Sequence, residues 1–200
     1  MSKVRGVNGQ ELPVFYGNQA VAQVEKAEGR KLTPVERRVV YEEGFVPGLY
    51  YDNKNIPTYG VGQTGEYIKK GFRASYEDHV KKTRRMIPQF DNLPEYMQEE
   101  LVQSTYRGDL GLSPTARRLF NEGRYEEAAK EFLNHEEYMN PRTSQQIKDR
   151  ILSVSKGMER MAQEYKNFSP EARRRALQRD VASTERKRSA HNGNPSEASS

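Results

Sequence analysis

The chain has 200 residues, of which 34% are hydrophobic and 30% charged, with a formal net charge of +5 and no cysteine. This length suits one domain with room for an appendage. The absence of cysteine excludes disulfides, zinc sites built on thiolates and thiol catalysis. No apolar run is long enough to span a bilayer, and the N-terminal sequence lacks the apolar segment of a secretion signal. We therefore expect neither a membrane span nor a signal peptide.

Most of the net positive charge lies near the C-terminus. Residues 166–200 contain eight basic and four acidic residues, a surplus of four charges out of the net five. A partner that binds through opposite charge is therefore expected at this segment and not at the body of the protein. The last residues, SAHNGNPSEASS, are too polar to bury enough surface to fold, which predicts a partly disordered tail.

The first predicted helices precede an unusual Gly- and Tyr-rich segment. An amphipathic fragment, Ala20–Ala27, predicts either a flexible arm or a docking helix. A stronger helix signal follows, because Thr33, Pro34 and Glu36 form a capping box with proline at the first helical position. This second helix is expected to end near Glu43.

A hairpin and a series of further helices complete the predicted elements. Residues 49–62 alternate like a pair of strands, and Asp52–Asn55 between them has short polar side chains that favour a turn. Helical periodicity with capping or proline signals marks the remaining elements. They are Ser75 to Pro88, Pro94 through Thr105, Ser113 to Gly123, Arg124 to Asn134, Thr143 to Tyr165, and a last helix that starts at Ser169. These elements predict an α+β fold that is mainly α.

Two short motifs and the histidines have simpler explanations than function. Gly60, Gly62 and Gly65 spell GxGxxG after a possible strand, but a dinucleotide site also needs a parallel βαβ unit, and no buried parallel strand follows. The tripeptide Arg107–Asp109 (RGD) is best explained by a helix that ends at a glycine. The three histidines lack the spacing of metal ligands, so no metal site is expected.

Glu43 and Asp52 are the strongest candidates for chemistry. Glu43 lies at the negative end of a helix dipole, next to Phe45, Val46 and Leu49, and both the dipole and desolvation raise a carboxyl pKa. Asp52 lies in a polar turn, where an aspartate is expected to stay ionised. One carboxyl group that keeps its proton and one that loses it are what glycoside hydrolysis uses.

Thr58 adds a hydroxyl that can hold a water molecule beside the ionised carboxylate. From the residues alone, two interpretations stay open. The three side chains form a hydrolytic site, or Glu43 simply ends a helix, Asp52 starts a turn and Thr58 is an ordinary strand residue.

The spacing of these residues follows the pattern E-G-x5-Y-x-D-x5-T-x-G-x-G-x-T-G. The pattern is formed by Glu43-Gly44, Tyr50, Asp52, Thr58, Gly60, Gly62, Thr64 and Gly65. It resembles the signature of the phage-type lysozymes, glycoside hydrolase family 24 of tailed bacteriophages. The resemblance implies a lysozyme-like helical domain with a small β-hairpin lobe flanking the catalytic cleft. It also implies that Glu43 is the general acid, that Asp52 orients or activates the attacking water, and that Thr58 positions this water.

The same resemblance implies substrate contacts from Tyr50, Gly60, Gln63 and Tyr106, without cofactor or metal. Two departures affect these contacts. Gln63 replaces the histidine common after this Gly-x-Gly, and the segment STYRGDLG, which includes Tyr106, replaces a Phe-Asn or Phe-Gln pair before glycine. The implied reaction is hydrolysis of the β-1,4 bond between N-acetylmuramic acid and N-acetylglucosamine in peptidoglycan.

The resemblance divides the chain into an N-terminal arm (1–32), a phage-type lysozyme domain (33–165) and a basic, partly disordered C-terminal tail (166–200). It implies use by a phage, either from the virion for wall penetration at entry or from the infected cytoplasm for host lysis. Peptidoglycan is then the substrate, virion proteins or a holin deliver the enzyme, and the tail contacts DNA or another anionic surface. The alternative is a non-enzymatic virion or nucleic-acid-binding protein on a lysozyme-like scaffold.

Overall fold

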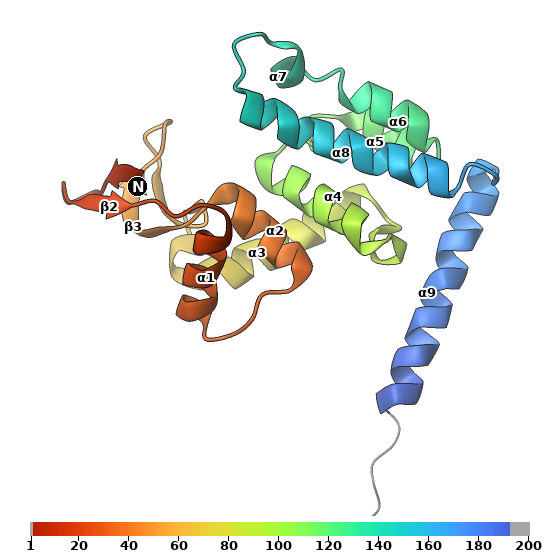
Figure 1. Ribbon diagram of the computed structural model, residues 1–200, viewed down its shortest axis with the longest axis horizontal. Helices are drawn as coiled ribbons and strands as arrows, with labels where there is room; N and C mark the ends of the chain where they lie inside the picture. The colour runs from red at the N-terminus through yellow and green to blue at the C-terminus, as the bar shows by residue number, and fades with distance from the viewer. Residues whose placement is uncertain (1, 193–200) are drawn as a thin grey trace, which may run out of the picture. The chain divides into compact units, whose positions relative to one another are not determined.

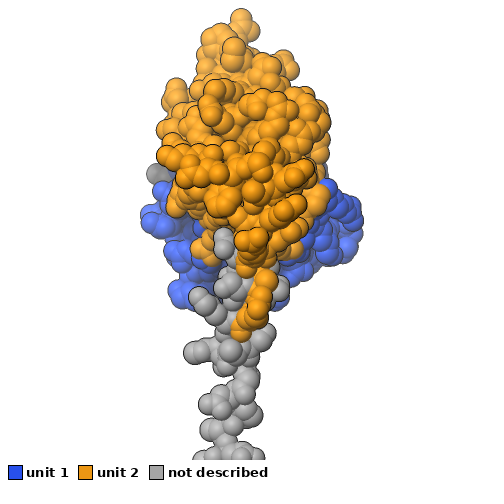
Figure 2. Space-filling model, turned by 90° about the vertical axis from the view of Figure 1, so that its right-hand side faces the viewer, with its two compact units in different colours: residues 1–85, 98–112 blue, residues 86–97, 113–200 orange. Residues whose placement is uncertain are grey.

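The computed structural model describes residues 2–192, with residues 180, 181, 183–185 and 187–192 described by their backbone alone. The fold is α+β and mainly helical, as the sequence predicts, and the described residues include two small antiparallel sheets (Figure 1). The chain divides into two compact units, which Figure 2 shows in blue and orange. Unit 1 comprises Met1–Arg85 and Gln98–Leu112, and unit 2 comprises Met86–Met97 and Ser113–Ser200.

The N-terminal residues fold against the predicted hairpin within unit 1. The first elements are β1 (Lys3–Arg5), β2 (Glu11–Pro13), α1 (Gly17–Glu28), α2 (Pro34–Glu43) and β3 (Val46–Tyr51). β1 pairs antiparallel with β2, and both strands contact β3. Phe15 and Phe45 exchange two backbone hydrogen bonds of 2.9 Å, and Leu12, Val14 and Val46 form a small apolar core. Part of the predicted N-terminal arm therefore forms strands that pack beside the hairpin.

α1 contains the amphipathic fragment of the sequence. It buries Ala20, Val21 and Val24 and packs against α2. Of the two expectations for this fragment, a flexible arm or a docking helix, the structure has a helix that is packed inside unit 1. The predicted domain boundary at residue 32 stays a prediction.

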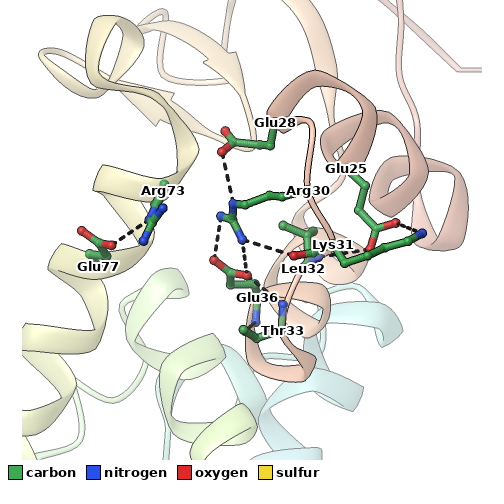
Figure 3. A network of polar contacts seen from close by, with 9 residues as sticks. All are labelled: Glu25, Glu28, Arg30, Lys31, Leu32, Thr33, Glu36, Arg73 and Glu77. Carbon is green, nitrogen blue, oxygen red and sulfur yellow. Dashed lines mark hydrogen bonds and ion pairs between the residues drawn. The ribbon is translucent and has the colours of Figure 1, made fainter. Parts of the chain in front are cut away.

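α2 follows the local signals of its sequence. The Thr33 hydroxyl accepts a hydrogen bond from the Glu36 amide at 3.3 Å, and the Glu36 carboxylate accepts one from the Thr33 amide at 2.8 Å, which completes the capping box. Arg30 donates to both Glu36 oxygens at 2.9 Å in the network of Figure 3. Burial raises the pKa of Glu36, but the hydrogen bonds from Arg30 and Thr33 outweigh it and hold the pKa below its ordinary value. The predicted start and end of this helix are confirmed.

The predicted hairpin is confirmed and gains a third strand. β3 pairs with β4 (Pro57–Gly60), which pairs with β5 (Gln63–Thr64), and all pairs are antiparallel. Asn55 in the turn has a φ of 59°, which short polar side chains tolerate. α3 (Tyr67–Met86) follows, so the predicted helix start at Ser75 is wrong. The helix is interrupted at Gly71 (φ 85°, ψ 174°), and Ser75 is a buried residue inside its second part.

α4 (Glu95–Arg107) begins directly after Pro94, as predicted. The remaining elements belong to unit 2. They are η1 (Phe90–Asn92), α5 (Pro114–Asn121), α6 (Tyr125–Phe132), α7 (Glu136–Met139), α8 (Gln145–Glu164) and α9 (Pro170–Asn192). α6 packs along α8, where the Ser155 hydroxyl donates to the Ala129 carbonyl at 2.8 Å. The N-cap of α8 is Ser144 and not the predicted Thr143, because the Ser144 hydroxyl accepts from the Ile147 amide.

The first turns of α9 are fixed to unit 2. The Arg173 guanidinium donates to the carbonyls of Gly123 at 2.7 Å and Phe168 at 2.8 Å, and it lies over the Tyr125 ring. Leu177, one turn later, is only 1% exposed. The beginning of the predicted tail is therefore a packed helix.

The predicted disordered end starts at Ser189, but α9 continues to Asn192, so the first four of these residues are helical. The rest of that prediction, residues 193–200, lies outside the described residues. Within the part of the chain that the structure describes, no helix combines the length and the apolar character needed to cross a membrane.

Candidate active site

Glu43 is the last residue of α2, and its side chain is half-buried. Gly44 ends the helix with φ 80° and ψ −176°, a conformation that is essentially restricted to glycine, and its amide donates to the Val40 carbonyl at 2.9 Å. Phe45 follows and is buried. Leu49 is 44% exposed, so it does not contribute the shielding of Glu43 that the sequence predicted.

A hydrogen bond from α4 orients the Glu43 carboxyl group. Gln103 donates from Nε2 to Glu43 Oε1 at 2.8 Å. About one turn earlier on both helices, Arg38 and Glu100 form a two-point ion pair with distances of 3.0 and 3.4 Å. Both contacts join α2 to α4 and fix the end of α2. The sequence motif does not include Gln103, although a polar residue directly after the apolar pair Leu101 and Val102 of a buried helix was a signal for it.

Asp52 organises the turn between β3 and β4. Its Oδ1 accepts hydrogen bonds from the amides of Lys54 at 2.8 Å and Ile56 at 2.9 Å, and its amide donates to the Ile56 carbonyl at 3.1 Å. None of the hydrogen bonds among the described residues uses Oδ2. Asp52 therefore has one oxygen that holds the turn and one that faces no protein donor.

The Tyr50 hydroxyl is electrostatically coupled to both Glu43 and Asp52. Tyr50 lies half-buried on β3, directly opposite Thr58 on β4. Burial raises the pKa of the Tyr50 hydroxyl, and the electrostatic effects of Asp52, Tyr16 and Glu43 raise it further. Both predicted catalytic carboxyl groups thus raise the pKa of the same hydroxyl group, that of Tyr50.

Thr58 and Gln63 lie in the buried part of the small sheet, each with 3% of its surface exposed. The Thr58 hydroxyl donates to the Ile56 carbonyl at 2.9 Å, which leaves its oxygen lone pairs as acceptors. Gln63 Oε1 accepts from the Val61 amide at 2.6 Å and so stabilises the β4–β5 turn. Gly60 has a φ of 62°, which favours glycine, and an added Cβ would also lie 2.6 Å from this oxygen.

Tyr106 connects α4 to the β4–β5 turn. Its hydroxyl donates to the Val61 carbonyl at 3.0 Å and accepts from the Ser75 hydroxyl at 3.1 Å. Its ring centroid lies 4.2 Å from that of His79. Burial raises the pKa of Tyr106, the hydrogen bond from Ser75 opposes this rise, and Glu43 adds to it. Tyr106 therefore lies in the electrostatic field of Glu43.

The short motifs that the sequence analysis set aside have structural roles. The three glycines of GxGxxG have φ between 56° and 69° and shape an antiparallel turn, not a parallel βαβ unit. Arg107 pairs with Asp109 at 3.0 Å, and Gly108 with φ 95° follows the end of α4. Among the described residues, no three His, Asp or Glu side chains are grouped closely enough to hold a metal ion.

No model of a known protein family matches this chain, and no curated protein sequence matches it either. The candidate site therefore rests on its own geometry and on the spacing of its motif. Unit 1 brings together Glu43, Tyr50, Asp52, Gln103 and Tyr106 through the hydrogen bonds and electrostatic effects above. Thr58 joins them through its pairing with Tyr50, and Gly60 and Gln63 lie in the adjoining turn. Such a set offers an oriented carboxyl group, a second carboxylate with an unused oxygen, and a hydroxyl acceptor.

Proposed function

We propose that this protein is a muramidase of the phage-type lysozyme kind, which hydrolyses the β-1,4 bond between N-acetylmuramic acid and N-acetylglucosamine in bacterial peptidoglycan. The observation that carries the proposal is the pair of carboxyl groups in unit 1. Glu43 is oriented by a 2.8 Å hydrogen bond from Gln103, and Asp52 keeps Oδ2 without a protein donor among the described residues. Hydrolysis of a glycosidic bond needs two carboxyl groups that flank the bond. The spacing of the motif assigns the two roles.

In this mechanism, Glu43 donates its proton to the oxygen of the departing sugar. Asp52 uses the oxygen that the turn leaves unused, Oδ2, to orient the attacking water or accept its proton. The Thr58 hydroxyl directs its own proton to Ile56, so its oxygen accepts a hydrogen bond from the same water. Each residue then has a distinct task that its hydrogen bonds permit.

We further propose that a phage uses the enzyme on the host wall, either from the virion at entry or from the infected cytoplasm at lysis. The support for this setting is the resemblance of the motif to phage enzymes. The segments before and after the resembling region favour the virion, where an enzyme needs contacts with other virion proteins.

A zymogram on bacterial cell walls, together with turbidity clearing by purified protein, tests the proposal. Glu43→Gln should lose nearly all activity and keep the wild-type melting temperature, because an amide cannot donate the catalytic proton. Glu77→Gln is the matched control, since Glu77 is an exposed carboxylate that pairs with Arg73 on α3. It should clear walls at the wild-type rate.

Clearing by Glu43→Gln at a near wild-type rate would overturn the proposed role of this residue. Inactivity of the wild-type protein on both walls and soluble glycan fragments would favour the non-enzymatic alternative. For an active protein, NMR of the first product assigns retention or inversion, which depends on the distance between the two carboxyl groups.

A further inference from the structure

Gln103 combines deep burial with an incomplete set of hydrogen bonds. Only 2% of the residue is exposed, and its Nε2 donates to Glu43 Oε1 at 2.8 Å. Its Oε1 is buried and has no hydrogen-bond partner among the described residues. A buried polar atom without a partner destabilises the folded state. Stability therefore does not explain why a glutamine occupies this position.

We propose that Gln103 is a positioning residue that holds Glu43 Oε1 and thereby makes Oε2 the oxygen that carries the catalytic proton. This inference rests on the proposed function. The amide of Gln103 is a donor at every pH, and a carboxyl oxygen accepts a hydrogen bond whether or not the other oxygen is protonated. The contact therefore persists before and after the proton is transferred, and it keeps the carboxyl plane fixed.

Further contacts hold α4 on both sides of this hydrogen bond. The Arg38–Glu100 ion pair joins the same two helices about one turn away, and Glu100 is itself buried. On the next turn of α4, the Tyr106 hydroxyl is bonded to the Val61 carbonyl. Gln103 thus lies between two contacts that fix α4, which is what a residue needs in order to position another group within a few tenths of an ångström.

The same hydrogen bond influences when Glu43 loses its proton. A donor stabilises the charged carboxylate, so it keeps the pKa of Glu43 lower than it would be without Gln103. Tyr50 on β3 and Tyr106 on α4 are electrostatically coupled to Glu43, and Asp52 is coupled to the same Tyr50 hydroxyl. Glu42 precedes Glu43 on α2 and pairs with Arg38 at 3.2 Å. Both tyrosines have raised pKa values and stay neutral at neutral pH, so neither phenol adds a charge that opposes the effect of the amide.

Gln103→Met tests the inference, because it removes the donor and the unpartnered oxygen and keeps the length of the side chain. The expected kcat is lower by roughly tenfold or more, with KM little changed. The alkaline limb of the kcat profile reports loss of the acid's proton, and it should move up by about one pH unit. The melting temperature should stay close to that of the wild type, since removal of the buried unsatisfied oxygen offsets the loss of the hydrogen bond to Glu43.

Ser104→Ala is the matched control on the same helix. Ser104 is 1% exposed, and its Oγ is also buried without a partner among the described residues. The substitution removes an unsatisfied oxygen but leaves the Gln103–Glu43 contact in place. It should keep the wild-type rate and pH profile. If any change in the core of α4 lowered activity, Ser104→Ala would lower it as well.

A titration of the Glu43 carboxyl carbon by ¹³C NMR separates this inference from the proposed function. The signal is assigned by its loss in Glu43→Gln, and its midpoint should be higher in Gln103→Met than in the wild type. If the wild type degrades walls and Glu43→Gln does not, an unchanged midpoint and pH profile in Gln103→Met overturn the positioning role alone. A destabilised Gln103→Met with unchanged kcat would also overturn it. An inactive wild type overturns the proposed function, and the positioning role with it.

Discussion

Replacing Gly44 with alanine should disturb both the stability of unit 1 and the position of Glu43. Gly44 has φ 80° and ψ −176°, and an added Cβ would lie 2.8 Å from the Phe15 carbonyl oxygen, closer than such atoms approach. This oxygen accepts the 2.9 Å hydrogen bond from the Phe45 amide. The new methyl group therefore has to push apart the residues that join the N-terminal segment to the start of β3.

The size of the effect follows from two contributions. A residue forced into a sparsely populated backbone region costs about 1–3 kcal/mol. Loss or weakening of one backbone hydrogen bond adds about 1 kcal/mol. Together they reduce the free energy of unfolding by about 3 kcal/mol, which corresponds to a fall in melting temperature of roughly 6–12 °C for a protein of this size.

Gly62→Ala is the matched control, because Gly62 also has a positive φ, 69°, but an added Cβ would meet no atom within 4 Å. It should lower the free energy of unfolding by about 1 kcal/mol, from the left-handed backbone alone. Thermal unfolding followed by circular dichroism measures both variants. Equal shifts for Gly44→Ala and Gly62→Ala would refute the argument from the Phe15 contact. Gly44→Ala should in addition lose wall-degrading activity per folded molecule, since Glu43 precedes it directly.

Three further predictions concern the carboxylates and the C-terminal helix. Asp52→Asn should lower the rate of wall clearing by roughly 10²-fold or more. Thr58→Ala should also lower this rate, at a nearly unchanged melting temperature. If both variants unfold instead, Asp52 and Thr58 are structural residues of a turn and a strand. A variant in which the exposed residues Arg174, Arg175 and Arg179 are replaced by glutamine keeps the packed start of α9, so it should still cleave soluble glycan fragments. It should bind DNA or intact walls more weakly, most clearly at low salt, and equal binding across a salt series would remove the role of the basic end. The pKa of Glu36 is held below its ordinary value of 4.5, so its stabilising effect is present above that pH and is lost as the pH falls through the lower, folded-state pKa. Melting temperature should therefore fall more steeply in acid for the wild type than for Glu36→Gln, and parallel curves would contradict this.

The sequence by itself determined those elements whose signals are local. The start of α2 depends on Thr33, Pro34 and Glu36, which bond to one another's backbone within four residues. The hairpin turn depends in the same way on Asp52, whose carboxylate binds the amides two and four residues later. The kink at Gly71 shows the limit of such signals, because no cap marked the beginning of α3 and the part of the helix before Ser75 was missed.

Only the tertiary structure decided which distant residues meet. Gln103 is 60 positions from Glu43, and Arg173 is 50 positions from Gly123, so no spacing in the sequence relates them. The first pair exists because the fold brings the end of α2 within hydrogen-bond reach of α4. The second pair fixes the start of the predicted tail as a packed helix. The strands β1 and β2 were not predicted for a related reason. Val7 and Phe15 beside them bond to the backbone of Leu49 and Phe45, and such bonds depend little on the side chains, because every residue except proline offers them.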